Sequence, residues 1–163
     1  MKTAVLNTND RLCEECQVCC YATRINVLKK PAFTRCDFQC ESGCSKYEER
    51  PQECRDHRCT WLIGFGDEEA RPDKLGVTFT ARSHPELGPW VSAHVIDRKK
   101  LKTELFKKTL AQLAERCTVI EIFQDRMMVM GGPPEQIEMF LRYTAKDLVP
   151  VQLISVDSLK RAR

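Results

Sequence analysis

Hydrophobic residues change their spacing near residue 75. Beyond that point, short apolar runs of strand-like composition predict strands over 75–81, 90–96, 118–123, 126–130 and 151–156. Apolar residues recur every three or four positions over 98–116 and from Ile137 to Leu148, which predicts two amphipathic helices. The order is β-β-α-β-β-α-β, an α+β layer whose helices we expect on one face of the sheet.

Capping and turn residues support these boundaries. Asp97 suits the N-cap of the first helix, since its carboxylate can accept from free backbone N–H groups. Gln124-Asp125 lies between two strand runs and predicts a hairpin turn. Gly131 and Gly132 end the next strand, and the prolines that follow suit the first turn of the second helix.

The first part of the chain has no long apolar period of either kind. Such a segment cannot bury much core by itself and needs another source of stability, which metal binding can supply. We therefore predict a cysteine-cluster metal-binding segment over 1–62, a linker over 63–74 and a small α+β region over 75–163. The metal-stapled segment is expected to pack on the α+β layer.

Cysteines are concentrated in that first segment. Nine of the ten lie between Cys13 and Cys59. Thiols crowded in this way are either disulfide-bonded or bound to a metal. The N-terminus lacks the apolar stretch of a secretion signal, and no apolar run approaches the roughly 20 residues that span a bilayer. We therefore predict a cytoplasmic protein without a membrane partner, in which the reducing compartment and the odd cysteine count favour metal.

The cysteine spacing suits more than one metal ion. Cys13 and Cys16 form a Cys-x-x-Cys pair, which aims two sulfurs at one point, and zinc takes four such ligands. Cys36, Cys40 and Cys44 would share one face if their stretch were helical. The total exceeds one tetrahedral site, so we expect two metals, or one metal with additional reactive thiols.

Iron–sulfur ligation fits part of the same pattern. Cys13-x-x-Cys16-x-x-Cys19 matches the first three ligands of a bacterial ferredoxin run, although the Cys-Pro of the fourth ligand is absent. Zinc and iron both accept thiolates, so the cofactor is expected to be zinc or iron, with an iron–sulfur cluster as one form.

Two motifs resemble a known family. The first is Cys13-x-x-Cys16-x-x-Cys19-Cys20, and the second is Cys44-x-x-Tyr47-x-x-Arg50-Pro51-x-x-Cys54-Arg55 followed by Cys59. Over residues 13–60 the chain resembles the CxxCxxCC family of zinc- or iron-chelating cysteine-cluster proteins. The chain departs from that family at Gln17 and Val18, where glycine is common, and at Lys46, where an apolar residue is common.

The resemblance implies a set of metal ligands: Cys13, Cys16, Cys19, Cys20, Cys36, Cys44, Cys54 and Cys59. Cys40 is extra, and is a ninth ligand, a spare thiol or a bystander. Around the ligands, Tyr47, Arg50 and Arg55 are expected to support the cluster, the two arginines by donating N–H bonds to metal-bound sulfurs. His57 is predicted to be a surface residue and Cys117 a buried structural one.

Charge adds little to this account. The net charge of +3 is too small to indicate nucleic acid. Residues 98–116 carry seven basic and two acidic side chains, with Phe106 as the single aromatic residue among them, so a solvated face is expected. No Ser/His/Asp order or His-Glu-x-x-His motif occurs, and nothing requires an enzyme.

Three functions remain open at this point. The first is a metal-chelating protein with a structural, sensing or storage role. The second is an iron–sulfur redox protein or oxidoreductase partner. The third is a zinc-stabilised nucleic-acid or protein adaptor. The sequence identifies no protein partner.

Overall fold

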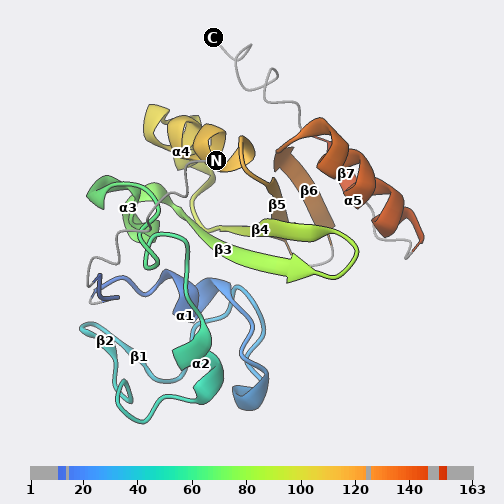
Figure 1. Cartoon of the computed structure of the whole chain (residues 1–163). Coiled ribbons are helices and arrows are strands. Elements are labelled where there is room, and N and C mark those ends of the chain that lie inside the picture. The colour runs from blue at the N-terminus through green and yellow to red at the C-terminus, as the bar shows by residue number, and fades with distance from the viewer. Residues whose placement is uncertain (1–10, 14, 124–125, 147–150, 154–163) are drawn as a thin grey trace.

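A five-stranded mixed sheet forms the centre of the molecule (Figure 1). The computed structural model describes residues 11–13, 15–123, 126–146 and 151–153. The strands lie in the order in which they occur along the chain: β3 (Val77–His84), β4 (Gly88–Val95), β5 (Thr118–Phe123), β6 (Arg126–Gly131) and β7 (Val151–Leu153). The α+β class and the β-β-α-β-β-α-β order are confirmed. The predicted turn at Gln124-Asp125, Leu148 and the end of the last predicted strand fall outside the described residues.

The two helices of the layer lie on opposite faces of the sheet, so the prediction that they share one face is wrong. α4 (Glu104–Ala114) connects the parallel pair β4 and β5, and α5 (Pro134–Lys146) connects the parallel pair β6 and β7. β5 and β6 are antiparallel, so the two pairs run in opposite directions. Crossovers between parallel strands are right-handed. The two crossovers advance in the same direction across the sheet, but their strands run in opposite directions, so the two helices lie on opposite faces.

Each face of the sheet therefore has its own core. On one face Phe106 and Leu110 of α4 pack against Val91 and Val119. On the other, Phe140 of α5 packs against a group that includes Ile120 and Val129. Neighbouring residues of β5, such as Val119 and Ile120, serve different cores, as expected when successive strand residues point to opposite faces.

The stretch 98–116 is two helices where the sequence predicts one. A 3-10 helix covers Arg98–Lys102, and Asp97 caps it by accepting from the Lys99 N–H at 3.0 Å. The chain is then extended at Thr103, whose hydroxyl caps α4 by accepting from the Phe106 N–H at 3.2 Å. The capping role of Asp97 is confirmed, but a second good N-cap six residues later restarts the helix.

The stretch 63–74, predicted as a linker, is folded onto the layer. It contains a 3-10 helix, Glu68–Ala70, and α3 (Pro72–Leu75), so Leu75 belongs to a helix rather than to the start of the first strand. Ala70 and Pro72 are buried, and Phe65 packs against the core beneath α4. This packing fixes the segment that joins the cysteine-rich part to the sheet.

The cysteine-rich part has only short elements: α1 (Val18–Ala22), a 3-10 helix Asn26–Leu28, β1 (Gln39–Cys40), β2 (Gly43–Cys44) and α2 (Gln52–Asp56). It lies against β3, the edge strand of the sheet (Figure 1). Cys59 pairs with Thr80, and the Thr60 N–H donates to Phe79 O at 2.7 Å. This pairing covers part of an edge that would otherwise expose unpaired backbone groups. In the described part of the chain, every helix is too short or too polar to cross a bilayer.

Candidate metal centre

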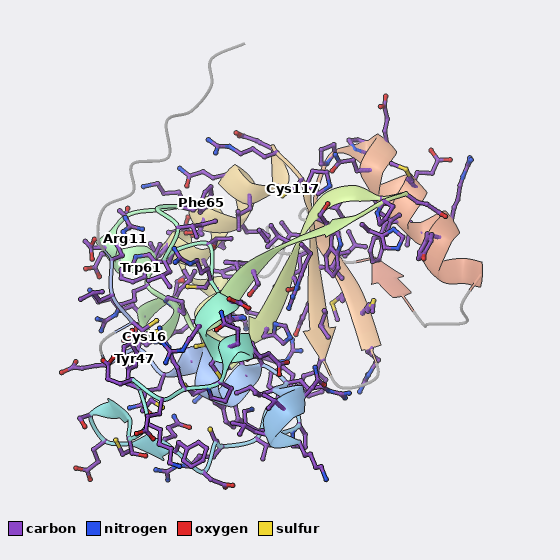
Figure 2. The ribbon with its side chains drawn as sticks, turned by 60° about the horizontal axis from the view of Figure 1, so that its bottom comes forward. Arg11, Cys16, Tyr47, Trp61, Phe65 and Cys117 are labelled. Carbon is purple, nitrogen blue, oxygen red and sulfur yellow. The ribbon has the colours of Figure 1, made fainter. Side chains whose placement is uncertain are left out.

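Seven of the eight predicted ligands surround one cavity of about 820 Å³. We call it the thiol cavity and define it by Cys13, Cys16, Cys19, Cys20, Cys36, Cys44 and Cys54. They come from the loop before α1, α1 itself, the loop before β1, β2 and α2. Cys16 and Tyr47, labelled in Figure 2, lie close together in this lower part of the molecule. Segments up to about forty positions apart in the sequence thus present sulfur to one space.

The three other cysteines differ in their surroundings. Cys59 does not line the thiol cavity, but it lies close enough to Cys13 and Cys16 to interact with them electrostatically. Cys40 is outside the cavity lining, and its sulfur lies 3.5 Å from the Ser42 hydroxyl. Cys117 lies well apart from Cys16 (Figure 2) and packs against the core beneath α4, but it is half-buried where the sequence predicts a buried cysteine. The cavity thus brings together seven of the eight predicted ligands, with Cys59 near two of them and Cys40 outside the lining.

Cys36, Cys40 and Cys44 do not share a helical face. β1 and β2 form a tight antiparallel hairpin in which Cys40 pairs with Gly43. Gly43 has a φ of 126°, a conformation that residues with a side chain rarely adopt. Cys44 of β2 lines the thiol cavity, whereas Cys40 of β1 does not. The helical expectation is wrong since glycine here makes a turn.

Gln17 links the first cysteine block to this hairpin. Its side-chain amide donates to Cys40 O at 2.7 Å and to Glu41 O at 3.3 Å. It occupies a position where the resembled family often has glycine, and it precedes α1, whose second and third residues are Cys19 and Cys20. Gln17 therefore cross-links the segment of the first cysteines to the β1–β2 hairpin.

The thiols of the cavity differ in acidity. Cys19 donates a hydrogen bond to Cys20, and this bond, helped by the charges of Lys30 and Arg50, lowers the pKa of Cys20 to about 7. The same bond and burial raise the pKa of Cys19. Burial raises the pKa of Cys16 to about 11 and also raises the pKa values of three others, Cys13, Cys54 and Cys59. Cys20 thus ionises more readily near neutral pH than Cys13, Cys16, Cys19, Cys54 or Cys59.

A buried lysine that the sequence analysis missed lies beside these sulfurs. Lys30 is 6% exposed, and its ammonium donates to the carbonyls of Tyr21, Thr23, Pro31 and Thr34 at 2.7–3.2 Å. It also interacts electrostatically with Cys19, Cys20, Cys36 and Cys54. Lysine is almost never buried without a partner. A lysine between two blocks of cysteines was therefore the feature of the sequence that could have indicated a buried charge beside the thiols.

Arg50 and Tyr47 form a pair at the cavity wall. The Arg50 guanidinium lies 4.0 Å from the centre of the Tyr47 ring, a cation–π contact. Its charge opposes the burial that raises the pKa of Cys13 and helps to lower the pKa of Cys20, and its Nε is buried without a hydrogen-bond partner. This arrangement is compatible with the predicted role of Arg50 as a donor to sulfur.

Arg55 makes different contacts. Its guanidinium donates to the backbone carbonyls of Glu48 and Arg50, the first at a short distance and the second at 3.0 Å. It therefore holds the turn that leads into α2, which carries Cys54. Its role toward sulfur stays a prediction.

Arg11 anchors the start of the described chain. It donates to Trp61 O at 2.8 Å, Phe65 O at 3.3 Å and Gly66 O at 2.8 Å, and it lies over the Trp61 ring at 4.9 Å. Figure 2 shows Arg11, Trp61 and Phe65 grouped together beside Cys16. This role was not predictable from the sequence, since the contacts join residues about fifty positions apart.

Replacing Arg11 with leucine should lower the free energy of unfolding by about 2–3 kcal/mol, because three carbonyls lose a charged donor. Chemical denaturation of the two proteins measures the difference. The matched control is Arg35→Leu, which removes an exposed guanidinium that donates to Gln39 O, and should cost less than about 0.5 kcal/mol. Equal losses in the two variants would contradict the anchoring role of Arg11.

Two histidines lie beside the cysteine segment. His57, predicted at the surface, is half-buried, lines the thiol cavity and has an enclosed Nε2 without a partner. His94 of β4 is 5% exposed, and its Nδ1 also lacks a partner. The surface expectation for His57 is wrong because the turn after α2 brings it against β3 and β4.

Acid should destabilise the protein through His94. Burial, together with the charges of Arg82 and His57, lowers the pKa of His94 to about 4. The unfolded chain binds this proton near pH 6.5, so stability is full above that pH and falls between about 6.5 and 4, by up to about 3 kcal/mol. Denaturation at pH 8 and pH 4.5 should show a smaller acid loss for His94→Gln than for the unmodified protein. Equal acid losses would exclude His94 as the cause.

The cavity has the donor chemistry for a soft metal, although its sulfurs are not yet arranged around one point. All ten cysteines are free thiols. Among the described residues, no group of three or more Cys, His, Asp or Glu forms a ready metal site. The donor set fits zinc or iron, since both favour thiolates. The sulfurs would have to move closer together to share an ion.

Comparisons with protein-family models, with curated proteins and with solved structures each found no match.

Proposed function

We propose that the protein binds zinc or iron through the eight cysteines associated with the thiol cavity. The observation that carries this proposal is the gathering of seven thiols, from five separate stretches of chain, around one space. The segment that holds them has only short helices and a two-stranded hairpin. A bound metal would cross-link these stretches and supply the stability that a small core does not.

The charges around the cavity support thiolate ligation. Lys30 and Arg50 both lower the pKa of Cys20, and Lys30 also acts on three further thiols. Each thiolate that binds a metal adds negative charge, which these two cations would offset. The resemblance of residues 13–60 to the CxxCxxCC family points to the same chemistry.

The number of thiols favours more than one ion. Eight thiolates fill two four-coordinate sites. Ligation by thiolates alone leaves no open position for hydrolytic chemistry, so we favour a structural, sensing or storage role. A redox iron–sulfur cluster uses the same ligands and is distinguished by experiment.

The adaptor hypothesis receives less support. Several basic residues of 98–116 have partners within the chain: Arg98 pairs with Glu121, Lys107 with Glu104, and Lys108 lies 3.8 Å from Asp67. Lys100 donates to Asp73 O, and Arg116 lies over the Phe65 ring. These contacts reduce the charge available to an acidic partner.

The first experiment is anaerobic purification of the full chain without added metal, followed by elemental analysis, a labile-sulfide assay and a visible spectrum. We expect stoichiometric zinc or iron. Zinc without visible absorbance identifies a chelator of the structural or sensing kind, and iron with labile sulfide identifies a cluster.

A chelator then tests whether the metal stabilises the fold. Removal of the metal should lower helical and strand signal from the cysteine-rich part while the sheet core remains folded, because only the former depends on metal cross-links. A chain that stays free of metal after reconstitution with Zn²⁺ and with Fe²⁺ under reducing conditions would overturn the proposed function.

A further inference from the structure

The eight candidate ligands belong to two parts of the cysteine-rich segment. α1 and the turn at Cys59 lie next to β3, whereas the β1–β2 hairpin lies farther from the sheet (Figure 1). We divide the thiols accordingly into two sets. The sheet-side set is Cys13, Cys16, Cys19 and Cys59, and the hairpin-side set is Cys20, Cys36, Cys44 and Cys54.

Electrostatic interactions join the members of the sheet-side set. Cys59 interacts with Cys13, and Cys16 interacts with Cys59. Cys19 interacts with both Cys13 and Cys16. Because such interactions weaken with distance, the four sulfurs are neighbours, although Cys59 is far from the other three in the sequence.

The hairpin-side set is joined in the same way. Cys54 interacts electrostatically with the three other members of this set. The buried ammonium of Lys30 interacts with three of the four members and with Cys19. Cys20 also interacts with Cys13 and Cys19, so the two sets adjoin at Cys20.

The geometry of α1 explains why the sets divide between Cys19 and Cys20. These two cysteines are consecutive residues of α1. Consecutive side chains of a helix point about 100° apart, so the pair is better suited to two ions than to one. The hydrogen bond between the two thiols keeps their sulfurs in contact. Two sites built on this pair would therefore adjoin, each with the four thiolates that zinc takes.

The sheet-side set is anchored to the packed part of the molecule. Cys59 pairs with Thr80 of β3 and is followed by two buried residues. Backbone N–H groups of Val18 and Asp73 act on the Cys16 sulfur and partly offset the effect of burial on its pKa. Two backbone N–H groups of the turn after Cys59 act on the Cys59 sulfur in the same way. Such donors hold a ligating sulfur in place and stabilise its thiolate.

The hairpin that carries Cys44 is less well anchored. β2, which contains Cys44, has only two residues, and the five residues that follow it, 45–49, are exposed. Segments with few buried contacts open locally at a low cost in free energy. A ligand on this hairpin should therefore leave its ion more readily than a ligand fixed beside β3.

We propose that the eight cysteines form two adjoining four-thiolate sites, one from each set, and that the hairpin-side site releases its ion first. This inference rests on the proposed function and adds to it which cysteines share an ion and which ion exchanges. The sheet-side ion would hold the fold of the segment. The hairpin-side ion would exchange with the surroundings, as a sensing or storage role requires.

Cadmium NMR of the full chain tests the proposal without any substitution. Cadmium is a soft ion that replaces zinc among thiolates, and it couples to the β protons of the cysteines that bind it. We expect two cadmium signals, each correlated with the four cysteines of one set. On addition of a chelator, the hairpin-side ion should dissociate faster by about tenfold or more, the range in which supporting contacts change metal binding.

The other outcomes separate this inference from the proposed function. A chain that takes up no cadmium would contradict the proposed function itself. Two ions correlated with other groups of cysteines, or one cysteine correlated with both ions, would overturn the division into these two sites. Simultaneous loss of the two ions, or earlier loss of the sheet-side ion, would overturn the order of release.

Paired substitutions give a second test by counting bound cadmium. Cys44→Ser/Cys54→Ser removes two ligands of one set and should leave one ion bound at unchanged affinity. Cys16→Ser/Cys54→Ser removes one ligand of each set and should leave no ion bound at that affinity. The control, Cys40→Ser/Cys117→Ser, alters thiols outside both sets and should keep both ions. Equal retention in the first two variants would overturn the division.

Discussion

Replacing Cys20 with serine should weaken metal binding by about a hundredfold, the loss expected when one of four thiolates is removed from a site worth about 10–16 kcal/mol. Cys20 interacts electrostatically with Cys13, Cys19 and Cys54, and so it occupies a central position among the sulfurs. Serine keeps the size of the side chain but is a poor ligand for a soft metal. Competition with a chromophoric chelator measures the affinity.

Two cysteines of the same chain supply the controls. Cys40→Ser alters a thiol outside the thiol cavity, and Cys117→Ser alters one packed against the core beneath α4. Neither change should affect metal content. Loss of metal in Cys40→Ser would make Cys40 a ligand and would contradict the grouping described above. Equal metal content in the Cys20 and Cys117 variants would show that the metal does not bind in the thiol cavity.

Replacing Lys30 with methionine should lower the free energy of unfolding by about 3–5 kcal/mol, the cost of breaking a buried charged network. Four backbone carbonyls lose their donor, and methionine offers them no N–H. The variant should also bind metal more weakly, since the ammonium offsets the charge of nearby thiolates. Denaturant titration of the metal-free protein and chelator competition measure the two effects separately.

The neighbouring residue provides a matched control. Lys29 is exposed and has a φ of 51°, and Lys29→Met changes the same side chain without removing a buried donor. Its free energy of unfolding should change by less than about 0.5 kcal/mol. If the two methionine variants were equally stable, the carbonyl contacts of Lys30 would have no part in holding the cysteine-rich segment.

The sheet region was predictable because its signals are local. The run Thr118–Phe123 has the branched and apolar composition of a strand, and the structure confirms it with the same bounds. The break at Thr103 was missed because apolar spacing continues across it, while a cap acts through a single side-chain hydrogen bond. The faces of α4 and α5 follow from strand directions, which no short window of sequence contains.

The candidate metal centre was likewise predictable from the sequence only in part. The sequence alone singled out the candidate ligands, since thiols at close spacing have few other uses in a short, core-poor segment. Only the tertiary structure decided that seven of the candidate ligands line one cavity while Cys40 lies outside its lining, and that Lys30 is a buried countercharge. Those facts depend on contacts between distant segments, and such contacts exist only once the chain has packed.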